Sequence, residues 1–260
     1  MNEILGMLLL AAVQGLTEFL PVSSSGHLVL AQTFMAVREG DVFFDVVLHL
    51  GTLGSVLVAY RRELIGLLRF DAESRRYILA LVVGTVPAVA IGLLLKDVLE
   101  SLFHAPVFAA GGLFVTAALL FSTRARRSRA AAAAGDGPRA PTLRQALLIG
   151  CGQAFAIVPG VSRSGTTIAV SLWLGLPRVE AARFSFLLSI PAICGALVLQ
   201  LVDRPALETD AWPFVLAALV AFGVGLLALR WTALAVVQAH FWKFGFYCVA
   251  VGTAALIALT

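Results

Sequence analysis

Charge is scarce in this sequence of 260 residues. Charged side chains make up 13% of it, about half of the roughly 25% that soluble domains carry. Cysteine is also scarce: Cys151, Cys194 and Cys248 stand singly in apolar sequence, and no C-x-x-C spacing occurs. This pattern excludes a disulfide framework and a cysteine-based metal site. We expect all three cysteines to be small, buried apolar side chains.

Long apolar runs fill most of the chain, which is 60% hydrophobic with a mean hydropathy of +0.95. The runs are continuous rather than alternating, which indicates membrane helices and not the strands of a barrel. The pI of about 9.3 is compatible with nucleic-acid binding, but the arginines lie in short segments between apolar runs. That distribution orients a membrane protein. We therefore expect an all-α, multi-pass membrane protein that binds no nucleic acid.

Two polar stretches interrupt the apolar sequence, P-V-S-S-S-G-H at 21–27 and P-G-V-S-R-S-G-T at 159–166. They match at one offset of 139 residues, which relates Gln14 to Gln153, Val22 to Val161, Ser23 to Ser162, Ser25 to Ser164 and Gly26 to Gly165. A helix can break at membrane depth only where its backbone faces protein or water. Matching breaks in two halves predict one site at the interface of an inverted-topology repeat.

The chain is expected to divide into two repeats, 1–123 and 142–260, joined by a cytoplasmic linker at 124–141. Each repeat begins with a re-entrant helix pair, at 2–35 and 143–176, and continues with three membrane spans. The spans, each close to the roughly 20 residues that a bilayer requires, are predicted at 43–60, 77–95, 106–122, 181–202, 212–229 and 242–259.

Charge predicts the orientation of these spans. The arginine-rich segments 61–76 and 124–129 flank a two-span hairpin, so they lie on one side, and the positive-inside rule places that side in the cytoplasm. Both termini then face outward. This placement of the arginine-rich segments is possible only if neither broken segment crosses the membrane fully. The charge distribution therefore supports re-entrant pairs.

The first break carries a carboxylate and hydroxyls. Gln14 and Glu18 share one helix face, and a carboxylate within a membrane segment is a functional-site candidate because it costs at least about 2.5 kcal/mol there. Ser24 and His27 follow in the break and at the start of the next half-helix. The neighbouring residues expected to bind substrate are Ser23, Ser25 and Gly26.

The second break carries the opposite charge. Arg163 stands alone between Arg144 and Arg178, and its neighbours Ser162, Ser164, Gly165 and Thr167 add hydroxyls and a tight turn. A guanidinium, hydroxyl donors and the amides of a helix N-terminus together form an anion site, which phosphate fits best. Asp45 and His49, four residues apart on one face, either line the same cavity or satisfy each other.

One carboxylate, one histidine, several hydroxyls and one arginine around a phosphate site indicate phosphoryl transfer on a lipid-borne substrate. The nucleophile is Ser24 with His27 as its base, His27 itself, or an activated water. Glu18, with Gln14 beside it, could hold a divalent cation that neutralises the phosphates.

The segments 14–27, 44–52 and 159–167 resemble the signature segments of the undecaprenyl-diphosphate phosphatase (bacitracin resistance) family, and the resemblance extends over essentially the whole chain. It implies a membrane hydrolase that converts undecaprenyl diphosphate to undecaprenyl phosphate and phosphate. This reaction recycles the lipid carrier of peptidoglycan synthesis and confers bacitracin resistance. The resemblance also implies Mg²⁺ or Ca²⁺, and a site that opens to the outer, periplasmic side of the bacterial cytoplasmic membrane.

The resemblance assigns roles by position. Glu18 matches the acidic residue of the first motif, Ser24 and His27 its nucleophile or base, and Arg163 the phosphate-binding arginine. Ser162 and Thr167 match the hydroxyls around that arginine. Gln14 stands at the first position of an E/Q-x-x-x-E motif, so a site with two carboxylate ligands loses support, and Gln14 supplies a neutral oxygen ligand or a hydrogen bond.

Three other readings compete. A type-2 phosphatidic acid phosphatase needs a histidine about six residues after its S-R, and Ala169 occupies that place, which excludes this class. A transporter or flippase for an anionic, phospholipid-like substrate would use the same inverted repeat. A purely structural membrane protein would tolerate Arg163→Ala. The sequence leaves open a homodimer and the accepted prenyl length.

Overall fold

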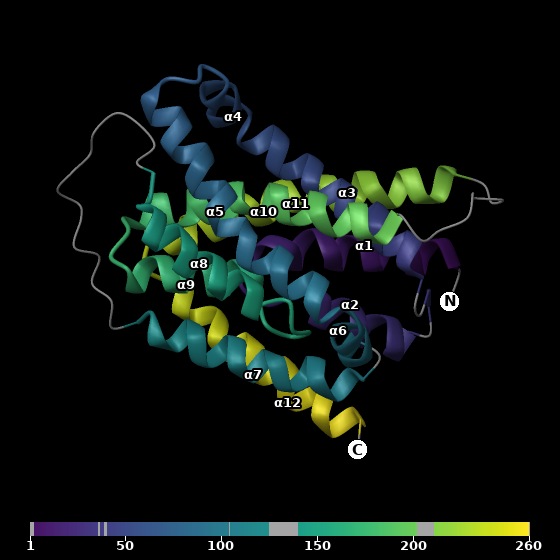
Figure 1. The fold of residues 1–260 in the computed structure, drawn as a ribbon. Helices are drawn as coiled ribbons and strands as arrows, with labels where there is room; N and C mark the ends of the chain where they lie inside the picture. The colour runs from purple at the N-terminus through teal and green to yellow at the C-terminus, as the bar shows by residue number, and fades with distance from the viewer. Residues whose placement is uncertain are drawn as a thin grey trace.

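The computed structural model describes residues 3–35, 37–38, 41–103, 105–124, 140–201 and 211–259. Its helices are α1 (Glu3–Phe19), α2 (Ser24–Met35), α3 (Val42–Ala59), α4 (Arg61–Leu67), α5 (Ala72–Leu94), α6 (Lys96–Phe103), α7 (Pro106–Ser122), α8 (Leu143–Phe155), α9 (Arg163–Trp173), α10 (Arg178–Leu201), α11 (Trp212–Val237), the 3-10 turn η1 (Phe241–Lys243) and α12 (Phe244–Leu259) (Figure 1). These ranges contain no strand, which confirms the all-α prediction. Most of the predicted linker, residues 125–139, lies outside them.

Helices that can cross a bilayer dominate the fold. Within the described ranges α5, α10, α11 and η1–α12 are long and apolar enough, α3 and α4 form a pair bent by 73°, and α7 is apolar but shorter. Each of the six predicted spans therefore corresponds to a helix. In α5 17% of the apolar window is buried, so most of its surface is available to lipid. The protein is a multi-pass membrane protein.

The expectation that all three cysteines are buried is wrong for two of them. Cys248 is buried, whereas Cys151 on α8 and Cys194 on α10 are exposed, and all three are free thiols. In a membrane protein, lipid is as apolar as the interior, so a small apolar side chain gains little by turning inward.

The helices of the first half recur in the second in the same order. α1, α2, α3, α5 and α7 are followed, about 139 residues later, by α8, α9, α10, α11 and α12. The packing exchanges partners between the halves: α1 packs along α11, α8 packs along α5, and α7 lies against α12. In Figure 1 the α1–α2 pair reaches inward from the end that carries both termini, and α8–α9 from the opposite end.

One apolar core joins the two halves around the breaks. Phe19 and Leu113 from the first half pack in the same cluster as Ile168 and Phe186 from the second. The rings of Phe19 and Phe186 meet edge to face with centroids 6.0 Å apart. Because Phe19 is the last residue of α1, this cluster fixes the point at which the first helix breaks.

Candidate active site

The first break separates α1 from α2. Pro21 lies in it and cannot donate a helical hydrogen bond, so the helix ends there. Ser23 has φ 69°, in the left-handed region that residues other than glycine rarely adopt. Its Oγ accepts from the backbone N–H of Gly26 at 3.3 Å, which caps the start of α2.

The second break separates α8 from α9 and carries the same kind of cap. Ser162 Oγ accepts from the backbone N–H of Gly165 at 3.0 Å. Thr116 of α7 ties the loop in place, because its Oγ1 donates to the carbonyl of Gly160 at 2.7 Å and accepts from the Ser162 N–H at 2.9 Å. The sequence analysis did not identify Thr116, since one threonine in an apolar span is a weak signal.

The two breaks touch each other inside the protein. A Cβ atom on Gly26 would lie 2.8 Å from the Cα of Gly160, so only glycine permits this approach of the two chains. Ser164 Oγ, from the second break, donates to the carbonyl of Leu20 in the first at 3.1 Å. The prediction that the breaks meet is confirmed.

Glu18 forms the centre of the contact between the breaks. Arg163 Nη2 lies 2.5 Å from Glu18 Oε1, and the Glu18 side chain is 5% exposed. Glu18 Oε2 accepts from Ser24 Oγ at 2.5 Å and from Gln14 Nε2 at 3.0 Å. One buried carboxylate thus faces the candidate nucleophile on one side and the candidate phosphate-binding cation on the other.

His49 also faces this carboxylate, whereas Asp45 does not. The Nε2 atom of His49 lies 4.0 Å from Glu18 Oε2, and its Nδ1 contacts the backbone carbonyl of Asp45 at 2.7 Å. The Asp45 carboxylate accepts instead from Gln32 Nε2 at 3.0 Å. The two alternatives for this pair were that it lines the cavity or that its side chains bond to each other. His49 lines the site, and the two side chains do not bond to each other.

Comparisons with known proteins show the family of this chain. The sequence profile of the bacitracin resistance protein BacA family matches residues 7–254. This chain belongs to the BacA family. An undecaprenyl-diphosphatase of Korarchaeum cryptofilum is 40% identical over 99% of this chain and 100% of its own length. Proteins of the same name from Desulfosudis oleivorans and Rhodopirellula baltica are 43% and 41% identical, each over 97% of this chain and over 97% and 96% of their lengths.

His27 does not contact Ser24 in this BacA-family protein, so the alternative in which His27 is the base of Ser24 lacks the contact that it requires. Its Nδ1 lies 2.8 Å from the carbonyl oxygen of Ser23, and its Nε2 lies 3.0 Å from the hydroxyl of Tyr247 on α12. Ser24 Oγ is bonded to Glu18 on α1, and both ring nitrogens of His27 have other partners. The carboxylate takes the place expected of the imidazole.

The other predicted phosphate-binding hydroxyls bind protein groups. Ser23 and Ser25 contact each other at 3.3 Å, and Ser162 and Ser164 do so at 3.2 Å. Thr167 Oγ1 donates to the carbonyl of Arg163 at 2.8 Å and lies 2.6 Å from Ser185 Oγ, a partner that the sequence analysis missed. These hydroxyls shape the two breaks, and their contact with substrate remains a prediction.

Several buried polar atoms at the site have no partner among the described residues. They include Arg163 Nη1 and Gln14 Oε1. An unpaired buried donor or acceptor costs about 1–3 kcal/mol. An anion that gives an oxygen to Arg163 Nη1 would remove one of these costs.

The oxygen donors at the site fit a hard divalent cation only in part. No group of three or more His, Cys, Asp and Glu side chains in the described ranges could hold a metal. Glu18 supplies one carboxylate, and Gln14 Oε1 is a buried oxygen without a partner. Mg²⁺ commonly takes one or two carboxylates together with substrate phosphates. The donor set therefore fits a cation held largely by the substrate, with Glu18 and Gln14 as protein ligands.

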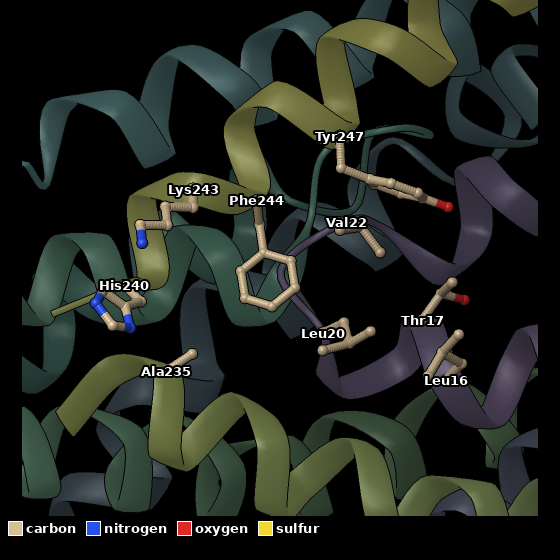
Figure 2. A pocket seen from close by; sticks show the side chains of 9 residues that line it. All are labelled: Leu16, Thr17, Leu20, Val22, Ala235, His240, Lys243, Phe244 and Tyr247. Atoms are coloured by element: carbon tan, nitrogen blue, oxygen red, sulfur yellow. The ribbon is translucent and has the colours of Figure 1, made fainter. Parts of the chain in front are cut away.

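An apolar cavity of about 420 Å³ lies beside the first break. Its lining residues are Leu16, Thr17, Leu20, Val22, Ala235, His240, Lys243, Phe244 and Tyr247 (Figure 2). Figure 2 shows Lys243 and His240 at one end of the cavity, while the Tyr247 hydroxyl points away from them. The cavity therefore runs alongside Leu20 and Val22 of the first break.

Proposed function

We propose that this protein hydrolyses undecaprenyl diphosphate to undecaprenyl phosphate and phosphate. Its relatives over the full chain are named undecaprenyl-diphosphatase. The observation that supports the proposal most strongly is the position of the Glu18 carboxylate. It bonds to both Ser24 and Arg163 where the two breaks meet. A nucleophile, its base and an anion-binding cation then surround one point at membrane depth.

The geometry supports Ser24 as the nucleophile and Glu18 as its base. Ser24 Oγ attacks the terminal phosphorus while its proton passes to Glu18 Oε2, 2.5 Å away. The bond from phosphorus to the bridging oxygen breaks, and undecaprenyl phosphate leaves with the electron pair. Glu18 releases this proton to solvent, and its carboxylate then deprotonates a water molecule that attacks the phosphoserine. Phosphate leaves, and Ser24 regains a proton.

Arg163 and the start of α9 bind the phosphate oxygens. Arg163 Nη2 is paired with Glu18, and its Nη1 has no partner in the described ranges, so the guanidinium can bridge the carboxylate and a phosphoryl oxygen. The first backbone N–H groups of α9 favour an anion at the same place. Both interactions strengthen as charge develops on the transferring phosphoryl group.

A divalent cation, Mg²⁺ or Ca²⁺, belongs to this proposal, with Glu18 and Gln14 as its protein ligands. When bound it would neutralise the diphosphate and stabilise the leaving phosphate. The arginine-rich ends of the helices support a location in the cytoplasmic membrane with the site open to the outer side. The recurrence of the helices supports an inverted repeat.

The experiment is a phosphate-release assay on purified protein in lipid nanodiscs with undecaprenyl diphosphate, with and without chelator. The wild-type protein should release one phosphate per lipid, and Glu18→Gln should not. Arg183→Lys serves as a control, because Arg183 pairs with Glu180 instead of Glu18. Substrate counterflow without phosphate release would favour the transporter, which the comparisons do not support.

A further inference from the structure

His27 has both ring nitrogens engaged. Nδ1 lies 2.8 Å from the Ser23 carbonyl oxygen, which can only accept, so Nδ1 carries the proton. In the neutral ring Nε2 then accepts, and the Tyr247 hydroxyl at 3.0 Å donates to it. The two rings stack nearly parallel, 7° apart, with centroids at 5.6 Å. An imidazole held in this way has no free nitrogen with which to attack phosphorus.

The second half of the chain makes the same contact with a residue that cannot be a base. The offset of 139 residues relates His27 to Thr166, as it relates Ser23 to Ser162. Thr166 Oγ1 donates to the carbonyl of Ser162 at 2.8 Å, just as His27 Nδ1 contacts the carbonyl of Ser23. In both halves, the side chain four residues after the capping serine holds that serine's carbonyl.

The two caps differ in backbone conformation. Ser162 has an ordinary φ of −73°, whereas Ser23 is left-handed at 69°. A left-handed conformation is unfavourable for a residue with a Cβ atom, so the first cap needs the stronger support. His27, itself held by Tyr247, supplies a longer and doubly anchored donor at that place.

Resting on the proposed function, we infer that His27 and Tyr247 are positioning residues of the BacA-family site. Tyr247 orients the His27 ring, and the ring holds the Ser23 carbonyl. The conformation of Ser23 in turn sets the direction of the next residue, Ser24, whose Oγ lies against Glu18. Neither ring needs to touch the diphosphate, so their loss should lower kcat and leave KM unchanged.

A pair of substitutions at one position separates positioning from chemistry. His27→Thr copies the donor found at Thr166, whereas His27→Ala has none. If His27 positions the cap, His27→Thr should retain about tenfold more kcat than His27→Ala, since one hydrogen bond of about 1.4 kcal/mol corresponds to that ratio. Equal losses in the two variants would contradict the inference, as would a phosphoryl group trapped on His27 instead of Ser24.

Tyr247→Phe tests the second member of the pair. It keeps the stacked ring and removes the donor, so kcat should fall about fivefold to tenfold at constant KM. Tyr77→Phe is the matched control, because Tyr77 is buried and its hydroxyl has no partner in the described ranges; its kcat should not change. A rise in KM for Tyr247→Phe, or an equal effect of both variants, would overturn the inference.

A direct measurement on the ring does not depend on turnover. The chain has four histidines, so ¹⁵N NMR of histidine-labelled protein in nanodiscs can resolve them, with the His27 signals assigned by their loss in His27→Thr. The wild-type ring should be the Nδ1–H tautomer, and Tyr247→Phe should shift the Nε2 signal, because Nε2 loses its hydrogen-bond donor while Nδ1 keeps the Ser23 carbonyl. If wild-type protein releases no phosphate but shows this tautomer, the proposed function fails and the contact stands. An Nε2–H tautomer would refute the positioning role itself.

Discussion

Replacing Glu18 with glutamine should affect both stability and turnover, because this carboxylate serves two partners. It pairs with Arg163 at 2.5 Å and accepts from Ser24 at 2.5 Å, and its side chain is 5% exposed. Glutamine preserves the size of the side chain and removes its charge. The substitution therefore leaves a buried guanidinium unpaired and deprives Ser24 of its base.

The two effects have separate magnitudes. Removing one member of a buried ion pair costs about 3–5 kcal/mol, and the lower end applies here because the Arg163 side chain is 18% exposed. Losing a general base lowers kcat by about 10²- to 10⁴-fold. Glu18→Gln should thus unfold at a lower temperature and release phosphate at least about a hundredfold more slowly.

The assay combines thermal unfolding in detergent with phosphate release in nanodiscs at a temperature where both proteins are folded. Glu180→Gln is the control, because Glu180 forms a similar partly buried pair with Arg183 at 2.5 Å. It should lose stability and keep its kcat. If Glu18→Gln retains wild-type kcat, the assignment of the base is wrong.

Further substitutions test other parts of the site. Arg163→Lys should raise KM about tenfold, because lysine cannot bridge Glu18 and a phosphate as a planar fork does; unchanged KM would argue against a phosphate contact. Gly26→Ala should destabilise the fold by about 1–3 kcal/mol through overpacking, while Gly92→Ala, where a Cβ meets nothing within 4 Å, should not. Gln14→Leu should raise the Mg²⁺ concentration for half-maximal activity about tenfold, and an unaltered Mg²⁺ titration would remove Gln14 from the ligand set.

The sequence predicted the elements that membrane physics constrains most tightly. A carboxylate and a guanidinium in apolar sequence each need a partner, so Glu18 and Arg163 were expected at one site, and the structure pairs them. Continuous apolar runs similarly predicted a helix at each of the six positions, and Pro21 the end of the first half-helix.

The sequence could not supply contacts between distant segments. Tyr247 lies 220 residues from its partner His27, and Thr116 lies 46 residues from Ser162, and neither belongs to a local motif. The proximity of Ser24 and His27 in sequence suggested a pair, but Ser24 bonds to Glu18 on α1 and His27 to Tyr247 on α12. For His49, the spacing in sequence could not decide whether the side chain lines the cavity or bonds to Asp45. The position of α3 against α1 places it beside Glu18.

A double-mutant cycle between Glu18→Gln and Arg163→Gln, read out as free energy of unfolding, tests most directly whether the two breaks form one polar centre. Two charges in direct contact should give a coupling energy of about 2 kcal/mol or more, with the double variant more stable than the sum of the single losses predicts. Losses that add within about 0.5 kcal/mol would mean that the two side chains do not meet in the membrane.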